Sequence, residues 1–398
     1  MLRIALSMLV GDRAKYAGLL FGITFTSFLV TFSASFLSAF LTRGFALISE
    51  NPTADVWVMD PTVQSVELTT NMPSFALNQV RSVDGVQSAI PLALGTAQVR
   101  FANGAFQSFQ VIGVDGATLA GVPPIEGRAT AAVLRAPDAV LVDPGGTRGK
   151  LDTPRLSVDQ WPHGGPHLDV PTRLLLAGDD LLVNDHRVQV WGRTEGLPRF
   201  PPRPLMYTTY SNADRILLPE RRRLTFVLAI AAPGVSHRDL AARIEAQTGL
   251  RARSAEDFKA DTVRWYLGNS EDVNDVAGML GLATVIGLGV TGVMLYMFTT
   301  ENLWQYAVLS AMGATPRMLL TMIFAQVAVC ALLGAGLGLG LCAIVGRIAV
   351  ALVGYPFRMM WFTPLLGTAA VVVVSLVAAA LSARPVLKLQ PVIVFAGS

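Results

Sequence analysis

The stretch MLLTMIFAQVAVCALLGAGLGLGLCAIVG, residues 318–346, decides the fold, because it contains no Asp, Glu, Lys or Arg. A helix needs about 20 apolar residues to cross the roughly 30 Å hydrocarbon core of a bilayer. Three other windows, residues 16–42, 276–300 and 359–383, are also free of these charged residues. We therefore predict four transmembrane helices, at residues 17–41, 276–300, 318–346 and 359–383.

The charge composition indicates a membrane protein that carries one large water-exposed domain. Of the 398 residues, 52% are hydrophobic and only 15% are charged, whereas soluble domains carry about 25% charged residues. The four windows account for this deficit. These numbers exclude a disordered chain, a cytosolic enzyme and a small disulfide scaffold. The net charge of +3 does not indicate a nucleic-acid partner, because residues 43–275 carry 23 basic and 26 acidic residues.

Basic residues near the windows predict the orientation, because Lys and Arg are enriched in short cytoplasmic segments. With the N-terminus in the cytoplasm, six basic residues lie on that side: Arg3, Arg13, Lys15, Arg317, Arg384 and Lys388. The short loop on the other side, residues 347–358, contains only Arg347 and Arg358. We therefore expect both termini and residues 301–317 in the cytoplasm, and residues 42–275 outside it.

Residues 42–275 are predicted to form a domain of mixed α and β structure in three portions. Residues 42–115 and 224–272 are expected to be α/β portions, with a β-rich subdomain at 116–223 inserted between them. The first portion would contain a strand at 55–60, a helix at 74–83 and a hairpin of strands 88–101 and 106–114. The second would contain a strand at 224–231, a helix at 236–248 and a strand at 250–254. The middle shows short strand signals at 139–142, 180–183 and 187–192.

The sequence of this domain shows no catalytic or metal-binding constellation. The spacing of His163, His167 and Asp169 could hold a metal ion, but these residues lie in a Pro- and Gly-rich stretch, where we expect a solvated loop. The run Arg221–Arg223 is expected to be a charged strand edge. Gly-x-Ser-x-Gly and His-Glu-x-x-His motifs do not occur. We therefore expect no catalytic residue and no metal ligand on this chain.

The joint between the second and third predicted spans reads ENLWQYAVLSAMGATP, residues 301–316. Its apolar residues Leu303, Tyr306, Ala307 and Leu309 fall roughly on one face of a short helix, and the following Gly and Pro end that helix. Two interpretations fit the pattern equally well. The segment could be a linker in the membrane interface, anchored by Trp304 and Tyr306, or a docking element for a cytoplasmic partner.

Small residues in the predicted spans indicate close helix packing. Gly18 with Gly22, and Gly334 with Gly338, have the four-residue spacing that lets helix backbones approach each other. Gly336 and Gly340 give a second, overlapping face of the third span. Contacts among the four spans and contacts in a dimer both fit this spacing. Gln326, early in the third span, can form a hydrogen bond to another helix.

The joint resembles the coupling region of FtsX/MacB-type (type VII) ABC transporter permeases, with LSAMGAT at residues 309–315 similar to the LKAxGA element of that family. LRIALS at residues 2–7 resembles the interfacial helix of the family, here expected at residues 1–16. The segment ARPVLKLQPVIVF at residues 383–395 resembles the closing R-x-DPAxxF element, within the expected tail 384–398. QYAVLSAMG at residues 305–313 and the tail ending at Phe395 are most similar to the DevC-like branch.

This resemblance implies a MacB-like fold: four transmembrane helices and a large α+β periplasmic core domain with porter-like and β-rich subdomains. It also implies a non-catalytic permease subunit in the bacterial inner membrane. ATP and Mg would bind a separate ABC ATPase, consistent with the absence of a Gly-x4-Gly-Lys-[Ser/Thr] motif. Two copies of this chain, or a heterodimer, would act as a mechanotransmitter, working with a HlyD-type membrane-fusion adaptor and a TolC-like outer-membrane channel. The alternatives are a Lol-like lipoprotein-releasing subunit and an FtsX-like regulator of cell-wall hydrolases.

The resemblance also assigns roles to residues of the joint and the spans. The residues expected to contact the ATPase are Glu301, Gln305, Leu309, Ala311, Met312, Gly313 and Ala314. Gln305 and Gln326 are neutral where many family members carry an acidic residue, so Glu301 is the expected charged contact. Gly18, Gly22, Gln326, Gly334 and Gly338 are expected to pack the helices or the dimer, with the first span contributing to the dimer contact.

Overall fold

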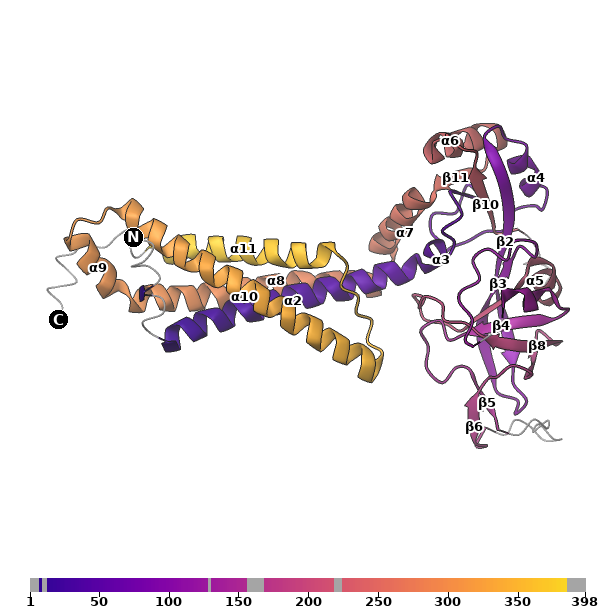
Figure 1. Ribbon diagram of the computed structural model, residues 1–398, viewed down its shortest axis with the longest axis horizontal. Helices are drawn as coiled ribbons and strands as arrows, with labels where there is room; N and C mark the ends of the chain where they lie inside the picture. The colour runs from indigo at the N-terminus through magenta and orange to yellow at the C-terminus, as the bar shows by residue number, and fades with distance from the viewer. Residues whose placement is uncertain (1–6, 9–12, 128–129, 156–167, 218–223, 385–398) are drawn as a thin grey trace. The chain divides into compact units, whose positions relative to one another are not determined.

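The computed structural model describes residues 7–8, 13–127, 130–155, 168–217 and 224–384. It divides into a helical unit, residues 1–40 with 270–398, and an α+β unit, residues 41–269 (Figure 1). Several predictions concern residues outside the described ranges: the loop with His163 and His167, the run Arg221–Arg223, most of the interfacial helix 1–16, and the tail after Arg384.

Among its described residues, the helical unit contains four helices that are long and apolar enough to cross a membrane. They are α2 (Arg13–Gly44), α8 (Glu271–Glu301), α10 (Pro316–Val353) and α11 (Phe362–Ser382), and the short helix α9 (Leu303–Ala311) joins α8 to α10. The prediction of four such helices is confirmed. Helix α10 extends seven residues beyond the predicted end at residue 346, so more than half of the predicted loop 347–358 is helical. The charge-free window ended at Arg347, but the helix ends where Gly354 adopts a left-handed backbone with φ of 65°.

Helix α2 packs against the other three long helices of its unit. Thr26 donates a hydrogen bond to the carbonyl of Gly287 in α8, and Ser27 donates one to the carbonyl of Ala335 in α10. Gly367 of α11 lies directly against Thr31. Small and hydroxyl-bearing residues therefore bring these helices together, as expected where lipid provides no hydrophobic driving force for helix association.

The α+β unit is built on one sheet of nine strands in the order β11-β1-β10-β2-β3-β9-β4-β8-β7. The strands are β1 (Val56–Met59), β2 (Val86–Arg100), β3 (Phe106–Val114), β4 (Ala139–Asp143), β7 (Asp180–Val183), β8 (His186–Arg193), β9 (Leu205–Thr209), β10 (Phe226–Ala231) and β11 (Arg251–Ser254). A separate pair contains β5 (Asp152–Pro154) and β6 (Thr172–Leu174). Strand β7 also pairs with the far end of β2, so the six strands from β2 to β7 in this order close into a ring.

The long strand β2 belongs to both halves of the sheet. Its first part pairs with β10 through Leu92, and its second part pairs with β3 from Ala93 onward. The predicted boundary at residue 115 therefore does not coincide with the structure, because β3 and the end of β2 complete the ring. The Ala-Asn-Gly-Ala turn at residues 102–105 predicts the hairpin of β2 and β3, but the parallel pairing of β3 with β9 joins residues far apart in sequence.

Strand β1 is buried on both faces. It shows how helices cover the half of the sheet that is formed by β11, β1, β10 and β2. Val56 and Val58 pack with residues of α4 (Ala76–Arg81) and α6 (His237–Thr248), while Trp57 and Met59 pack on the other face with Phe258 of α7. Helix α7 (Ala255–Asn269) was not predicted. The ring has its own interior, which includes Val99, Phe109, Val140 and Val190. The short helices α3 (Ala46–Ser49), α5 (Tyr210–Ile216) and η1 (Ala131–Arg135) complete the unit.

Candidate functional site

The joint between α8 and α10 begins at Asn302, the single residue between α8 and α9. Its backbone leaves the helical region, with φ of −98° and ψ of 10°. Its buried side chain donates a hydrogen bond to the carbonyl of Phe298 in α8, over 2.7 Å, and its own carbonyl accepts a hydrogen bond from the amide of Tyr306. Asn302 therefore ends one helix and starts the next.

The end of α9 is a Schellman motif, which the sequence Met-Gly-Ala-Thr-Pro specifies. Gly313 has φ of +96°, a backbone conformation that costs other residues energy. The amide of Gly313 donates to the carbonyl of Ser310, and the amide of Ala314 donates to that of Leu309, both over 3.0 Å. Thr315 then caps α10 through its side-chain oxygen, and Pro316 occupies the first turn. The turn from α9 to α10 is thus fixed by local backbone chemistry.

Helix α9 has one buried face and one exposed face. Tyr306 and Ala307 are fully buried in the core of the helical unit, and Leu303 and Leu309 pack partly against the same core. The predicted apolar face is therefore the inner face. Tyr306 does not anchor the helix in an interface, because its hydroxyl is buried and donates to Oε1 of Gln326 in α10 over 3.0 Å.

The expected ATPase contacts divide between surface and core. Glu301, Gln305, Ala311, Met312 and Gly313 are exposed, and Met312 exposes 71% of its surface. Leu309 and Ala314 instead pack against the helical core. Five of the seven expected ATPase contacts are thus accessible to a partner. The other two, Leu309 and Ala314, stabilise the turn by packing against the core.

The carboxylate of Glu301 lies 3.5 Å from the ammonium of Lys15 in α2. Lys15 is one of the basic residues that predict the orientation, and the sequence did not predict its contact with the joint. The two side chains border a cavity of about 380 Å³ that is also lined by Gly18, Met294 and Phe298. The side chains of Lys15 and Glu301 remain 31% and 44% exposed, so this ion pair contributes little to stability.

The glycines predicted to pack the spans lie in different surroundings. A side chain added at Gly22 would meet Met294 of α8, at Gly334 it would meet Ile23 of α2, and at Gly338 it would meet Ser27 of α2. These three positions are contacts within the chain. Gly18 has open space beside it.

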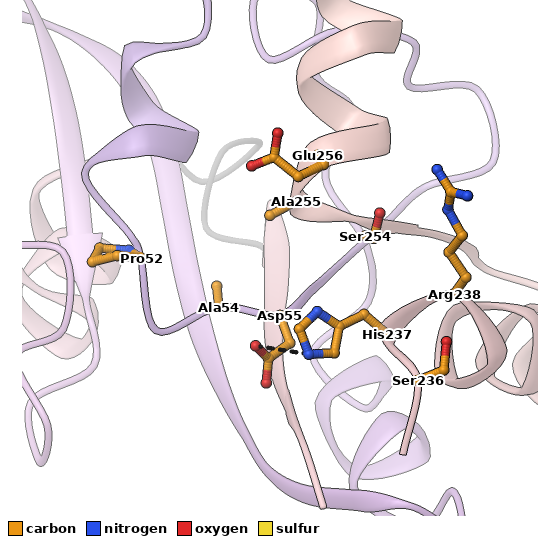
Figure 2. A pocket seen from close by; sticks show the side chains of 9 residues that line it. All are labelled: Pro52, Ala54, Asp55, Ser236, His237, Arg238, Ser254, Ala255 and Glu256. Carbon is orange, nitrogen blue, oxygen red and sulfur yellow. Dashed lines mark ion pairs between the residues drawn. The ribbon is translucent and has the colours of Figure 1, made fainter. Parts of the chain in front are cut away.

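A pocket of about 500 Å³ in the α+β unit is lined by residues at the starts of α6 and α7 (Figure 2). Nε2 of His237 lies 3.4 Å from Oδ1 of Asp55. The hydroxyl of Ser254 donates to Asp257, which Arg238 also contacts, and these hydrogen bonds from Arg238 and Ser254 lower the pKa of the Asp257 carboxyl. The Ser254 hydroxyl is hydrogen-bonded to this carboxylate and not to His237. Ser254 is therefore not arranged as a nucleophile that His237 would activate. Sequence reasoning missed the pocket, whose residues come from three distant segments.

A buried ionic network lies beside the ring. The carboxylate of Glu50 accepts hydrogen bonds from Arg199 over 2.5 Å, from the Tyr207 hydroxyl over 3.0 Å and from the amide of Leu197 over 2.6 Å. The side chains of Arg199 and Glu50 are only 6% and 7% exposed. Burial raises the pKa of the Tyr207 hydroxyl well above its usual value, although the charge of Arg199 opposes this shift. The network is structural, since its groups bond one another inside the unit.

Comparison with family models finds a match for part of the helical unit. Residues 277–391 match the model of the family described as FtsX-like permease C-terminal. This region, which begins inside α8, is therefore similar to the C-terminal domain of FtsX-like permeases. Among curated proteins, no sequence matches the chain.

The solved structures that are similar to part of this chain include the following two. One is the extracellular domain of the noncanonic ABC-type transporter YknZ from Gram-positive bacteria, at 12% identity and a TM-score of 0.33, covering 50% of this chain and 99% of that one. The other is the periplasmic region of MacB from Actinobacillus actinomycetemcomitans, at 12% identity and a TM-score of 0.36, covering 56% of this chain and 96% of that one.

Proposed function

We propose that this chain is the permease subunit of an ATP-driven type VII ABC exporter in a bacterial inner membrane, close to the DevC-like branch. A separate cytoplasmic ATPase, which holds ATP and Mg, would dock on the exposed face of α9. Two copies of the chain would transmit the closure of the ATPase to the α+β unit in the periplasm. The observation that carries this proposal is the family match at residues 277–391, which includes α9 and its turn.

The geometry of the joint supports a docking role over a passive linker. The buried face of α9 and the turn at Gly313 hold the helix in place, while Gln305, Ala311 and Met312 remain accessible. A helix that is fixed on one side and open on the other suits a partner that pushes on it. Glu301 offers an exposed carboxylate at the start of this surface.

Co-purification tests this proposal. The full-length chain should co-purify with an ATPase encoded beside it, and Met312→Glu should weaken that association, because it places a charge on the exposed face of α9. Gln79→Glu, an exposed change on α4 in the α+β unit, is the matched control and should have no effect. Absence of any associated ATPase would refute the proposal, and unchanged association of Met312→Glu would refute the docking face.

The proposal extends to the other partners expected from the family. A HlyD-type adaptor and a TolC-like channel would complete the export path, and the α+β unit is the part available to the adaptor. Cross-linking in intact cells would capture the adaptor. Capture of a cell-wall hydrolase would favour the FtsX-like function instead, and capture of a lipoprotein the Lol-like one.

A further inference from the structure

The hydrogen bond between Tyr306 and Gln326 joins α9 to α10 inside the helical core. The Tyr306 hydroxyl donates to Oε1 of Gln326 over 3.0 Å, and the two residues are 0% and 1% exposed. Their surroundings are apolar and include Leu19, Ile323 and Val327. A polar group buried in such surroundings is costly unless it is hydrogen-bonded. The bond therefore opposes separation of the two helices.

The same two helices are also tied at their other end. The Schellman motif at Gly313 and the Thr315 cap fix the turn that leads from α9 into α10. Leu309 and Ala314, on either side of this turn, pack against the helical core. Helix α9 and the first part of α10, up to Gln326, are thus closed into a helical hairpin by a turn at one end and a buried hydrogen bond at the other.

The connection of α9 to α8 is of a different kind. One residue with a non-helical backbone, Asn302, separates the two helices, and its side chain bonds back to Phe298 within α8. Rotation about the backbone at Asn302 can change the angle between α8 and α9 while the hydrogen bond from Tyr306 to Gln326 stays intact. Helix α9 is therefore joined to α8 through the single residue Asn302, and to α10 through the turn and the buried hydrogen bond between Tyr306 and Gln326.

We propose that Tyr306 and Gln326 are positioning residues that make α9 and α10 move as one body, so that force on α9 displaces the third span relative to the second about Asn302. The inference rests on the proposed function, because it takes the ATPase as the source of that force. It goes beyond that function by naming the bond that transmits the movement and the span that receives it.

The experiment compares variants that break this bond with a matched control. Tyr306→Phe and Gln326→Met each remove one side of the hydrogen bond and keep the size of the side chain. Tyr296→Phe makes the same chemical change as the first variant, at a tyrosine of α8 that is 52% exposed. The full-length chain is reconstituted in nanodiscs with its ATPase, and spin labels at Leu282→Cys in α8 and Leu352→Cys in α10 report the distance between the two spans with and without ATP.

We expect Tyr306→Phe and Gln326→Met to keep the ATPase bound while the fraction of molecules that change distance with ATP falls about threefold to tenfold, the factor that corresponds to one hydrogen bond. The double variant should lose no more than Gln326→Met alone, because Tyr306→Phe removes only a bond that Gln326→Met already removes. Tyr296→Phe should behave like the unmodified chain.

Each other outcome has a definite meaning. Absence of a bound ATPase on the unmodified chain refutes the proposed function. A distance change that persists in both variants overturns the inference alone. Loss of ATPase binding in both variants also overturns the inference, because the bond would then be needed only for the folded position of α9 and not for transmitting its movement. If Tyr306→Phe does not fold, Gln326→Met and Gln326→Asn, which shortens the reach of the amide, carry the test.

Discussion

Arg199 sits within the buried network of Glu50 and Tyr207, so its replacement tests how much the α+β unit depends on that network. Arg199→Met would leave the carboxylate of Glu50 buried without its cation. We expect a loss of about 3–5 kcal/mol in the free energy of unfolding, because removal of one partner of a buried ion pair strands the other. Denaturant unfolding of the full-length chain in detergent, followed by tryptophan fluorescence to which buried Trp57 contributes, measures this loss.

The double variant Glu50→Gln/Arg199→Met distinguishes the stranded charge from lost packing. It removes both charges and should recover a large part of the stability. Arg187→Met, which breaks the exposed pair with Asp180, is the control and should change little. Equal effects at positions 199 and 187 would contradict the role of burial.

The glycines of α10 provide a second test at single residues. A Cβ at Gly338 would lie against Ser27 and 2.7 Å from the carbonyl oxygen of Thr24, whereas a Cβ at Gly340 would have no atom within 4 Å. Gly338→Ala should therefore destabilise the helical unit by about 1–3 kcal/mol through overpacking. Gly340→Ala should be neutral or slightly stabilising. Thermal unfolding in detergent compares the two, and an equal response would argue against the packing of α2 on α10.

The sequence could not separate these two glycine faces. Gly334 with Gly338 and Gly336 with Gly340 have the same four-residue spacing, and only the position of α2 decides which face is in contact. The partner of Tyr306 was equally hidden, because no local pattern relates it to Gln326, twenty residues further along the chain. The residue types indicated that such contacts would occur, but tertiary structure decided which residues make them.

At the level of elements, the turn at Gly313 tests whether backbone geometry alone positions α9. Gly313 has φ of +96°, and a Cβ added there would have no atom within 4 Å, so Gly313→Ala introduces backbone strain without a clash. We expect a cost of about 1–2 kcal/mol, with weaker association of the ATPase. Co-purification and thermal unfolding measure the two effects. Gly289→Ala, in the interior of α8 with open space around it, is the control and should stabilise that helix.

The elements that sequence reasoning identified carry strong periodic signals, and the missed helix α7 does not. Its buried residues Phe258, Thr262 and Tyr266 have the spacing of one helical face, but the middle one is polar. Apolar periodicity therefore does not reveal the helix. In the ring, β4 and β9 are both buried at all five positions. The apolar run of β4 indicates a strand, whereas Thr208 and Thr209 of β9 are polar, so its strand signal is weaker.

At the level of the whole molecule, the proposed orientation makes a labelling prediction. Gln79→Cys in α4 and Gln305→Cys in α9 are both exposed positions, on opposite sides of the proposed membrane. A membrane-impermeant maleimide that passes the outer membrane should label position 79 in intact cells, and position 305 only after the inner membrane is opened. Both native cysteines, Cys330 and Cys342, are buried, so background labelling should be low. Labelling of position 305 in intact cells would contradict the orientation.

The pairing of β1 has a consequence for the order in which the α+β unit forms. Val56 pairs with Ala229 of β10 and with Ser254 of β11, whereas all strands of the ring lie between these points in the sequence. A chain that emerges from its N-terminus can close the ring while β1 still lacks both neighbours. Strand β1, which is made first, is therefore the last to gain its partners, and its apolar face must be kept from aggregation until residue 254 arrives.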